Sequence, residues 1–218
     1  MLDAQSEAAR LATLKEYGLL DTPTETAFDV IVQEAASVTN SPIAMISLVD
    51  EGRQWFKAAV GVDHRENPID ESICAHAIRS DELFTVADAS ADARFRNIPA
   101  VAKEGGIRFY AGAPLRMRNG AKLGTLCVID IAPRDDLDPE ERAALEMLAR
   151  RTVAAFELRR DIGDAAGLDG GDAQDWLEES ADLLARAAVA LDRAGASAPA
   201  AHLEHVVAMV DALRVPKG

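Results

Sequence analysis

The segment from Ser72 to His76 (Ser-Ile-Cys-Ala-His) combines the residue types that do chemistry most readily. Ser72 should begin a short helix, whose free N–H groups and dipole would favour an anion in a neighbouring cavity. Cys74 lies about one turn into that helix, where the thiol pKa is lowered, and His76 can exchange a proton near neutral pH. The two side chains diverge on a helix, so they cannot ligate one metal ion. A buried thiol and a hydrogen-bonded structural histidine are the more common roles of these residue types.

Cys127 is the second of two cysteines in the chain. If the helix that carries Cys74 covers the strand that carries Cys127, the two thiols could form a redox pair. A separate group of side chains could hold a carboxylate or phosphate, because a guanidinium makes paired hydrogen bonds to these anions. Its members are Arg94, Arg96, Arg108 and Tyr110. The alternative is that the arginines form ion pairs within their loops, with Asp88, Asp92 and Asp130 as partners.

The stretch from Ile107 to Asp130 should position these groups, because it predicts a β-hairpin. Asn119-Gly120 is the strongest short hairpin signal, since a type I′ turn needs a positive φ at both central residues. Side chains alternate across a strand, so counting from a two-residue loop divides the hairpin into two faces. The mixed face carries Tyr110, Gly112, Pro114, Arg116, Leu123, Thr125, Cys127 and Ile129. The apolar face carries Phe109, Ala111, Ala113, Leu115, Met117, Lys122, Gly124, Leu126 and Val128. We expect helices on the apolar face and a cavity over the mixed face.

The rest of the chain supplies the elements that would flank this hairpin. Runs of buried-strand composition predict strands at residues 43–49, 54–60 and 83–86. Apolar residues at helical spacing predict three long helices: residues 4–17, a second helix that ends at about residue 39, and residues 139–160. Short helices are predicted at residues 72–80 and 99–103. Thr24 or Thr26 would cap the second helix and Asp138 the last one. The segments 61–71 and 87–106 should be loops, and a loop as long as the second often serves as a lid.

The chain should divide into one larger domain and a helical appendage. Residues 1–162 hold all the elements described so far, and residues 163–171 contain four glycines and predict a linker. Residues 172–218 predict two amphipathic helices that form a hairpin. Such a pair cannot bury its apolar stripes alone, so it should pack on itself, on the domain or on a second copy.

Composition narrows the function. The chain has 218 residues and a net charge of −14, which opposes binding to nucleic acid or to an anionic membrane. Two cysteines are too few for a disulfide scaffold and suit a reducing compartment. We see no apolar leader and no run of about 18 apolar residues, so we expect a cytoplasmic protein. No catalytic triad, phosphate-binding loop or metal cluster is evident, and no cofactor can be named.

Four segments together resemble a known family: TLKEYGLLDTPTETAFD, IAMISLVDEGRQWFKAAVG, SICAHAIRSDELFTVADASADARFRNIPAV and IRFYAGAPLRMRNGAKLGTLCVID. They closely resemble the GAF domains of bacterial sensor proteins, unbroken in order and spacing from about Glu7 to Arg160. The resemblance implies a sheet with its main strands ordered 2-1-5-4-3 and a pocket covered by the two long loops. Ser47, on the alternating face of its strand, would join the floor of that pocket.

The fold we predict is α+β: a GAF/PAS-like antiparallel sheet of five to six strands with helices on one face, followed by the helical hairpin. The function implied is a ligand-sensing or regulatory domain, not an enzyme, that passes its state through flanking helices in a homodimer to a signalling partner. The candidate pocket residues are Ser47, Ser72, Cys74, His76, Arg108, Tyr110, Gly112, Thr125 and Cys127.

Two alternatives remain open. Some GAF proteins reduce free methionine sulfoxide with pocket cysteines, although the three-cysteine pattern of that subfamily is absent here. The domain could also be a dimerisation or partner-binding scaffold whose pocket is filled.

Overall fold

The computed structural model describes residues 4–166 and, singly, residues 186, 189 and 206. The chain forms two compact units, residues 1–158 and 159–218. Helix α5 (Pro139–Ala166) runs beyond the predicted end near Arg160 into the first residues of the predicted linker. The rest of that linker and the predicted helical hairpin at residues 172–218 lie outside the described residues.

A six-stranded sheet forms the centre of the first unit, and every paired neighbour is antiparallel. The strands are β1 (Ile43–Val49), β2 (Arg53–Val60), β3 (Glu66–Pro68), β4 (Phe84–Val86), β5 (Phe109–Arg116) and β6 (Lys122–Asp130), in the order β3-β2-β1-β6-β5-β4. This confirms the predicted fold class and the order of the five main strands. The sequence did not predict β3, which has three residues and contains Pro68. Proline is confined to sheet edges, and β3 lies at one.

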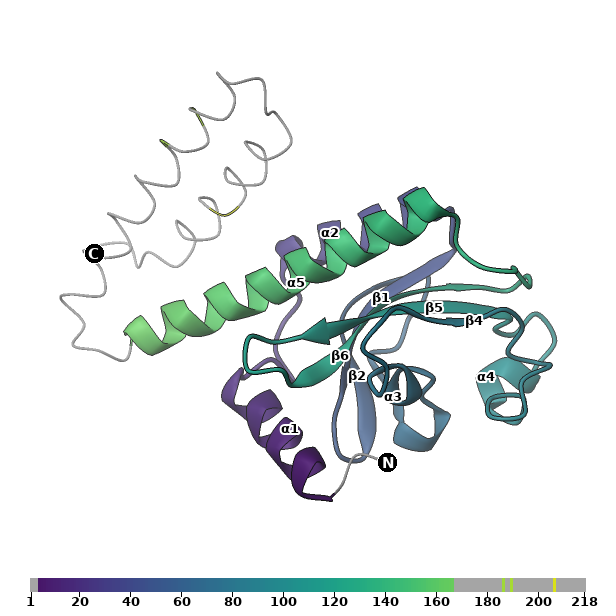
Figure 1. Ribbon diagram of the computed structural model, residues 1–218, viewed down its shortest axis with the longest axis horizontal. Coiled ribbons are helices and arrows are strands. Elements are labelled where there is room, and N and C mark those ends of the chain that lie inside the picture. The colour runs from purple at the N-terminus through teal and green to yellow at the C-terminus, as the bar shows by residue number, and fades with distance from the viewer. Residues whose placement is uncertain (1–3, 167–185, 187–188, 190–205, 207–218) are drawn as a thin grey trace. The chain divides into compact units, whose positions relative to one another are not determined.

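Helices α2 (Thr26–Val38) and α5 lie on one face of the sheet and two short helices lie on the other, while α1 (Ala4–Glu16) lies at the end of the sheet near the β5–β6 turn (Figure 1). Helices α2 and α5 bury their apolar stripes against the apolar face, as predicted, and Leu14 of α1 reaches the same core. The opposite face is covered by α3 (Cys74–Ala77), α4 (Pro99–Ala102) and the 3₁₀ turn Ile69–Glu71. The sheet therefore separates two hydrophobic cores.

The first core, between the sheet and the long helices, is aliphatic and aromatic. Phe28 of α2 packs on Phe156 of α5 with 5.1 Å between ring centroids. Trp55 lies in this core and Phe56 in the other, because successive side chains along β2 point to opposite faces. The side chains that the sheet contributes include Ala44, Ile46, Leu48, Ala111, Ala113, Leu126 and Val128.

The second core fills much of the space over the mixed face. Residues 87–106 contribute Phe95, Ile98 and Val101 to it, and all three are buried. The backbone N–H groups of Ala89 and Ile107 donate to the carbonyls of Arg108 and Ala100. This long segment is therefore a packed cover with its own buried side chains, and only a small space remains beneath it.

The turn of the β5–β6 hairpin corrects the sequence prediction. Met117 pairs with Ala121 through a 2.9 Å hydrogen bond, so the loop has three residues. Gly120 has φ +87°, while Asn119 is not among the residues with positive φ, so the turn is not type I′. A register shift between Pro114 and Arg116 then restores the predicted pairing from Pro114–Thr125 onward.

That shift also changes the faces of Lys122 and Leu123: Lys122, predicted on the face opposite to Arg116, pairs with Arg116. Leu123, predicted on the mixed face, lies in the core under the long helices, because a one-residue slip in a strand reverses which face a side chain meets. From Thr125 on, the faces are as predicted: Cys127 and Ile129 lie in the second core, and Leu126 and Val128 in the first.

Helix capping was predicted correctly for α5 and wrongly for α2. Asp138 Oδ1 accepts hydrogen bonds of 2.8 Å from the N–H groups of Glu140 and Glu141, and the Asp138 N–H donates to Glu141 Oε2 at 2.9 Å. This is a reciprocal capping box. Glu25 occupies the cap position of α2 without a side-chain cap bond, so neither Thr24 nor Thr26 has the predicted role.

Candidate functional site

A buried cluster of polar side chains surrounds Cys74 on the mixed face of the sheet. Cys74 Sγ accepts hydrogen bonds from Gln54 Nε2 at 3.3 Å and from Tyr110 Oη at 3.2 Å. Cys127 Sγ lies 3.7 Å from Cys74 Sγ, and both cysteines are free thiols. Tyr110 Oη also lies 3.3 Å from Thr125 Oγ1. The cluster thus joins a thiol on α3 to side chains on β2, β5 and β6.

Local structure brings these groups together. Ser72 Oγ accepts the Ala75 N–H at 3.0 Å, which begins α3 and directs Cys74 toward the sheet. Gly112 makes room for the ring of Tyr110, since a Cβ at position 112 would lie 2.3 Å from Tyr110 Oη. Cys127 is fixed in the middle of the sheet, between β1 and β5. One partner is therefore on a short helix and the other on a central strand.

The hydrogen bonds affect the two thiols in opposite directions. Burial disfavours the thiolate of Cys74, but hydrogen bonds from Cys127, Thr125 and Tyr110 outweigh it and lower the pKa of Cys74 to about 6. Burial and the adjacent Cys74 charge raise the pKa of Cys127 well above its ordinary value. The same two causes raise the pKa of Tyr110. Cys74 is therefore the first group of the cluster to ionise, and Cys127 and Tyr110 remain protonated donors.

A cavity of about 140 Å³ opens beside this cluster. Its inner wall is buried and includes Cys74, Tyr110, Phe56 and Ile129, while Lys103 at its outer end is exposed. The other lining residues are mostly apolar; they include Ile43, Met45, Val62, Ile73, Ala100 and Ile107, with Gln54, His64, Asn67 and Glu71 as polar members. The cavity lies beside the position predicted from the hairpin, because Thr125 and Cys127 are covered by the cluster and do not line it.

Six of the nine predicted pocket residues lie together on this face. Cys74, Tyr110, Thr125 and Cys127 form the cluster and Gly112 accommodates the tyrosine ring. Ser47 pairs with Thr125 across β1 and β6, so their side chains share a face. Ser47 Oγ is buried and has no hydrogen-bond partner among the residues described.

The other three predicted residues have structural surroundings. Ser72 caps α3. His76 lies edge-on to Phe95, with 5.0 Å between ring centroids, and its pKa is lowered by burial and by the charges of Arg79 and Arg94. Arg108 donates to the carbonyls of Val101 and Ile107 at 2.9 Å each, so it holds the segment before β5. None of the three lines the cavity.

The alternative prediction, that the arginines form ion pairs with aspartates of their own loops, is correct for one pair. Arg94 binds Asp92 at 2.6 Å. Asp130 instead binds Arg134, which also donates to the carbonyls of Thr39 and Asn40. Asp88 accepts from Ser90. These carboxylates therefore bind neighbouring residues of the chain.

Gln54 is the member of the cluster that sequence reasoning missed. It donates to Cys74 Sγ and, at 3.8 Å, to Met45 Sδ. A signal was present, because Gln54 is two residues before Phe56 on β2 and therefore shares its face. An amide side chain on the same strand face as a buried aromatic side chain indicates a buried polar group beneath residues 87–106.

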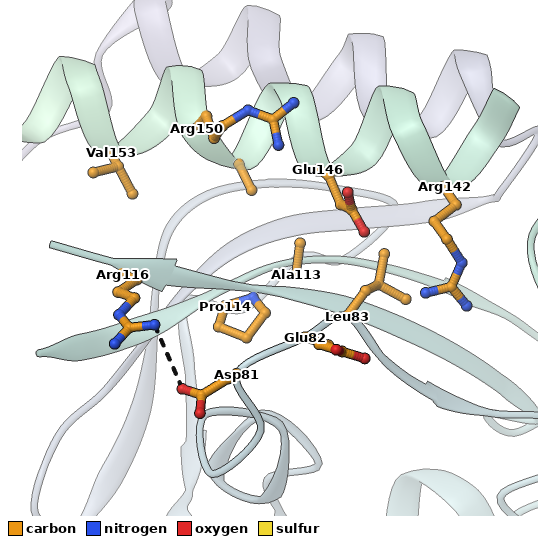
Figure 2. A pocket seen from close by; sticks show the side chains of 11 residues that line it. Asp81, Glu82, Leu83, Ala113, Pro114, Arg116, Arg142, Glu146, Arg150 and Val153 are labelled. Atoms are coloured by element: carbon orange, nitrogen blue, oxygen red, sulfur yellow. Dashed lines mark ion pairs between the residues drawn. The ribbon is translucent and has the colours of Figure 1, made fainter. Parts of the chain in front are cut away.

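A larger groove of about 620 Å³ lies between α5 and the β4–β5 edge (Figure 2). Its floor is apolar and includes Leu83, Ala113 and Ala149. Its rim carries equal numbers of opposite charges, from Asp81, Glu82, Glu146, Arg116, Arg142 and Arg150. Arg142 binds Asp136 at 2.8 Å and Arg116 lies 3.7 Å from Asp81. Its charges balance and it has no buried polar group aimed inward, so the Cys74 cavity is the better candidate site.

Residues 4–166 contain no cluster of three or more His, Cys, Asp or Glu side chains with metal-binding geometry. None of the helices described there has the length and apolar character that crossing a membrane requires.

Comparison with known proteins identifies the family of this chain. The family model described as GAF domain matches residues 23–156. A cyclic di-GMP phosphodiesterase of Pseudomonas aeruginosa is 44% identical over 167 residues, which cover 75% of this chain. The match covers 28% of that relative's length.

Two solved structures are similar in fold at 18% sequence identity. The GAF domain of a phosphoenolpyruvate-protein phosphotransferase from Acinetobacter covers 71% of this chain and 94% of its own, with a TM-score of 0.52. The corresponding domain from Coxiella burnetii covers 74% of this chain and 99% of its own, with a TM-score of 0.54. Since the family model matches more than half of the residues, this chain belongs to the GAF domain family.

Proposed function

We propose that this chain is a sensory module of bacterial signal transduction that binds a small molecule in the Cys74 cavity. The observation that carries the proposal is the cavity itself, which is mostly apolar and has hydrogen-bonding groups at its inner end. An apolar cavity of about 150 Å³ accommodates a molecule the size of benzene. The ligand class is therefore a small, largely apolar molecule with one polar group that Gln54 or Tyr110 can bind.

The sheet provides the route by which binding would reach the long helices. Tyr110 and Ile129 line the cavity, and their strand neighbours Ala111 and Val128 lie in the core beneath the helices. Adjacent strand residues share one backbone and point to opposite faces. A displacement of β5 or β6 on the cavity side would therefore be felt by the residues that pack on α2 and α5.

We extend the proposal to a homodimer formed through the helical face. Val30, Val38 and Met147 are 38%, 43% and 52% exposed on α2 and α5. They lie on the helices that Glu34 and Arg151 join by a 2.9 Å ion pair. Exposed apolar side chains around a polar link are suited to an interface between copies. Sedimentation velocity of the wild type and Met147→Glu would test this, and we expect only the variant to be monomeric.

The similarity to part of a cyclic di-GMP phosphodiesterase supports a signalling partner that carries the output. In this proposal the chain regulates such a partner in the cytoplasm and is not itself the enzyme. The two free cysteines are consistent with a reducing compartment. The scaffold alternative requires a filled pocket, and the space beside Cys74 argues against it.

Native mass spectrometry of the freshly purified full chain tests the ligand proposal. We expect a small molecule to be retained by the wild type and lost from Val62→Trp, because the indole would occupy the cavity that Val62 lines. Ala12→Trp is the matched control, since Ala12 is exposed on α1 and lines no part of this cavity. Equal retention by both variants would place the ligand elsewhere, and an apo wild type that binds nothing from a metabolite extract would reject the proposal.

A further inference from the structure

We propose that Cys74 and Cys127 form a peroxide-oxidisable pair, in which Cys74 reacts and Cys127 converts the product into an intramolecular disulfide. This inference goes beyond ligand sensing, because the event is covalent and needs no bound ligand. It rests on three observations: the distance between the sulfur atoms, the unequal surroundings of the two thiols, and the cavity that reaches one of them.

The distance between the thiols is short and one of them is on a small element. Their Sγ atoms are 3.7 Å apart, and a disulfide bond is about 2.05 Å long. Cys127 is held between two neighbouring strands, whereas Cys74 lies on a helix of four residues. A shift of α3 toward the sheet by less than about 2 Å would close the gap.

The surroundings distinguish the two thiols. Cys74 Sγ accepts hydrogen bonds from Gln54 and Tyr110, which favour its thiolate form. Cys127 Sγ approaches the Met45 carbonyl at 3.7 Å, and a carbonyl favours a protonated thiol. The thiolate is the nucleophile in thiol chemistry. Cys74 is therefore the attacking sulfur and Cys127 the resolving one.

An oxidant can also reach Cys74 more easily than Cys127. Both cysteines are buried, but Cys74 lines the cavity and Cys127 does not. Hydrogen peroxide has two heavy atoms and is smaller than the 140 Å³ space beside Cys74. The oxidant can thus meet Cys74 while Cys127 is shielded by the cluster.

The reaction has two steps. In the first, the Cys74 thiolate attacks one peroxide oxygen, the O–O bond breaks, and the departing hydroxide takes a proton to leave as water. Cys74 is then a sulfenic acid. In the second, the Cys127 sulfur attacks the Cys74 sulfur, the S–O bond breaks, the S–S bond forms, and a second water leaves. Two thiols and one peroxide give one disulfide and two waters, and the thiols supply the two electrons.

The disulfide would change the site. It would tie α3 to the centre of the sheet and convert the Cys74 sulfur, which Gln54 and Tyr110 bind, from a thiolate into a neutral disulfide sulfur that accepts hydrogen bonds weakly. Cys74, which lines the cavity, would then be cross-linked to Cys127. Oxidation would therefore alter the shape and polarity of the same cavity that the proposed ligand uses.

Intact-mass analysis of the native full chain, treated with hydrogen peroxide, tests the inference. We expect the wild type to lose two hydrogens, with Cys74 and Cys127 joined in the peptide map. Cys127→Ala should gain one oxygen, and dimedone, which reacts with sulfenic acids, should trap it on Cys74. Cys74→Ala and Cys74→Ser should retain an unmodified Cys127. Tyr110→Phe, which lacks one donor to Cys74, should be oxidised about tenfold more slowly.

Several results would overturn the inference. One is a wild type in which both thiols remain free while methionines are oxidised; another is a disulfide only between separate chains. A third is oxidation of Cys127 in Cys74→Ala at the wild-type rate. Circular dichroism and the peroxide reaction in urea provide the control for unfolding, because an unfolded chain would lose the rate difference between wild type and Tyr110→Phe. Ligand retention is measured without oxidant, so the two proposals can fail separately.

Discussion

The Tyr110 hydroxyl connects the candidate site, since it contacts both Cys74 and Thr125. Its position depends on the missing side chain at Gly112, where a Cβ would lie 2.3 Å from the hydroxyl oxygen. Gly112 is not among the residues with positive φ. Glycine is therefore required here because a larger side chain would collide with Tyr110, and not because of its backbone conformation.

Gly112→Ala tests this close approach. We expect the free energy of unfolding to fall by about 1–3 kcal/mol, the usual cost of overpacking a core. We also expect the pKa of Cys74 to rise, because the displaced hydroxyl no longer donates to its sulfur. Urea denaturation and the pH dependence of thiol alkylation would measure the two effects. Gly52→Ala is the matched control, with no atom within 4 Å of its added methyl group. Equal stability of the two variants would contradict the assigned role.

The thiol of Cys74 should make stability depend on pH. Its pKa is lowered to about 6 by hydrogen bonds to the thiolate, whereas an unfolded cysteine has a pKa of about 8.5. The unfolded chain therefore binds more protons between these values, and the free energy of unfolding rises with pH across that window. The raised pKa of Cys127 has the opposite effect above about pH 8.5.

Urea denaturation of the wild type and Cys74→Ser at pH 6 and pH 8 would check the pH effect. We expect the wild type to gain stability between these pH values relative to the variant. Taking the difference cancels other groups that titrate in the window, including His76. A wild type and variant that change in parallel would show that the folded state does not favour the thiolate.

Part of the site could be predicted at the residue level. Alternation along β5 and β6 brought Tyr110, Gly112, Thr125 and Cys127 to one face, because strand periodicity needs only local counting. Sequence could not show that Tyr110 folds back over Gly112 and fills the space above Thr125. It also missed Gln54, since which polar side chain reaches a given thiol depends on the packing of distant elements.

At the level of elements, local chemistry accounts for what was predicted and tertiary contacts for what was not. The capping box at Asp138 is a short-range signal and was predicted correctly. The turn at Asn119-Gly120 was placed correctly, but its three-residue form depends on a register shift farther along the hairpin. Strand β3 has only three residues and forms by pairing with β2, so its own composition gives little indication.

Asp138→Ala tests the start of α5. Loss of the two side-chain hydrogen bonds should lower the free energy of unfolding by about 1 kcal/mol, the typical cost of losing an N-cap. Thermal or urea denaturation would measure it. Asp135→Ala removes a nearby exposed carboxylate that caps no helix and serves as the control. Indistinguishable stabilities of the two variants would mean that the capping box does not hold the helix.

At the level of the whole molecule, both described cores lie within one compact unit. The buried residues of the first core run from Leu14 to Phe156, and those of the second lie between Met45 and Ile129. The two cores share the sheet and lie on opposite faces of it. The described unit thus has, within residues 1–158, the hydrophobic material that a stable domain needs.

Removing residues 172–218 tests the independence of this unit. We expect the shortened chain to unfold cooperatively with the midpoint of the full chain, because the core residues are all retained. A chain that ends at Arg150 is the contrasting variant, since it lacks Phe156 and its contact with Phe28. We expect that chain to lose cooperative unfolding. A full-length midpoint much higher than that of the 171-residue chain would show that the unit depends on the removed segment.

The division of the molecule into a sensing face and a helical face is the central claim, and isoleucine-methyl NMR tests it most directly. A bacterial metabolite extract would be added to the full chain, with Val62→Trp as the control. We expect the methyl signals of Ile43, Ile73 and Ile129, which line the cavity, to shift first and only in the wild type. Shifts confined to Ile31 and Ile46 in the core under the helices, or equal shifts in Val62→Trp, would contradict the claim.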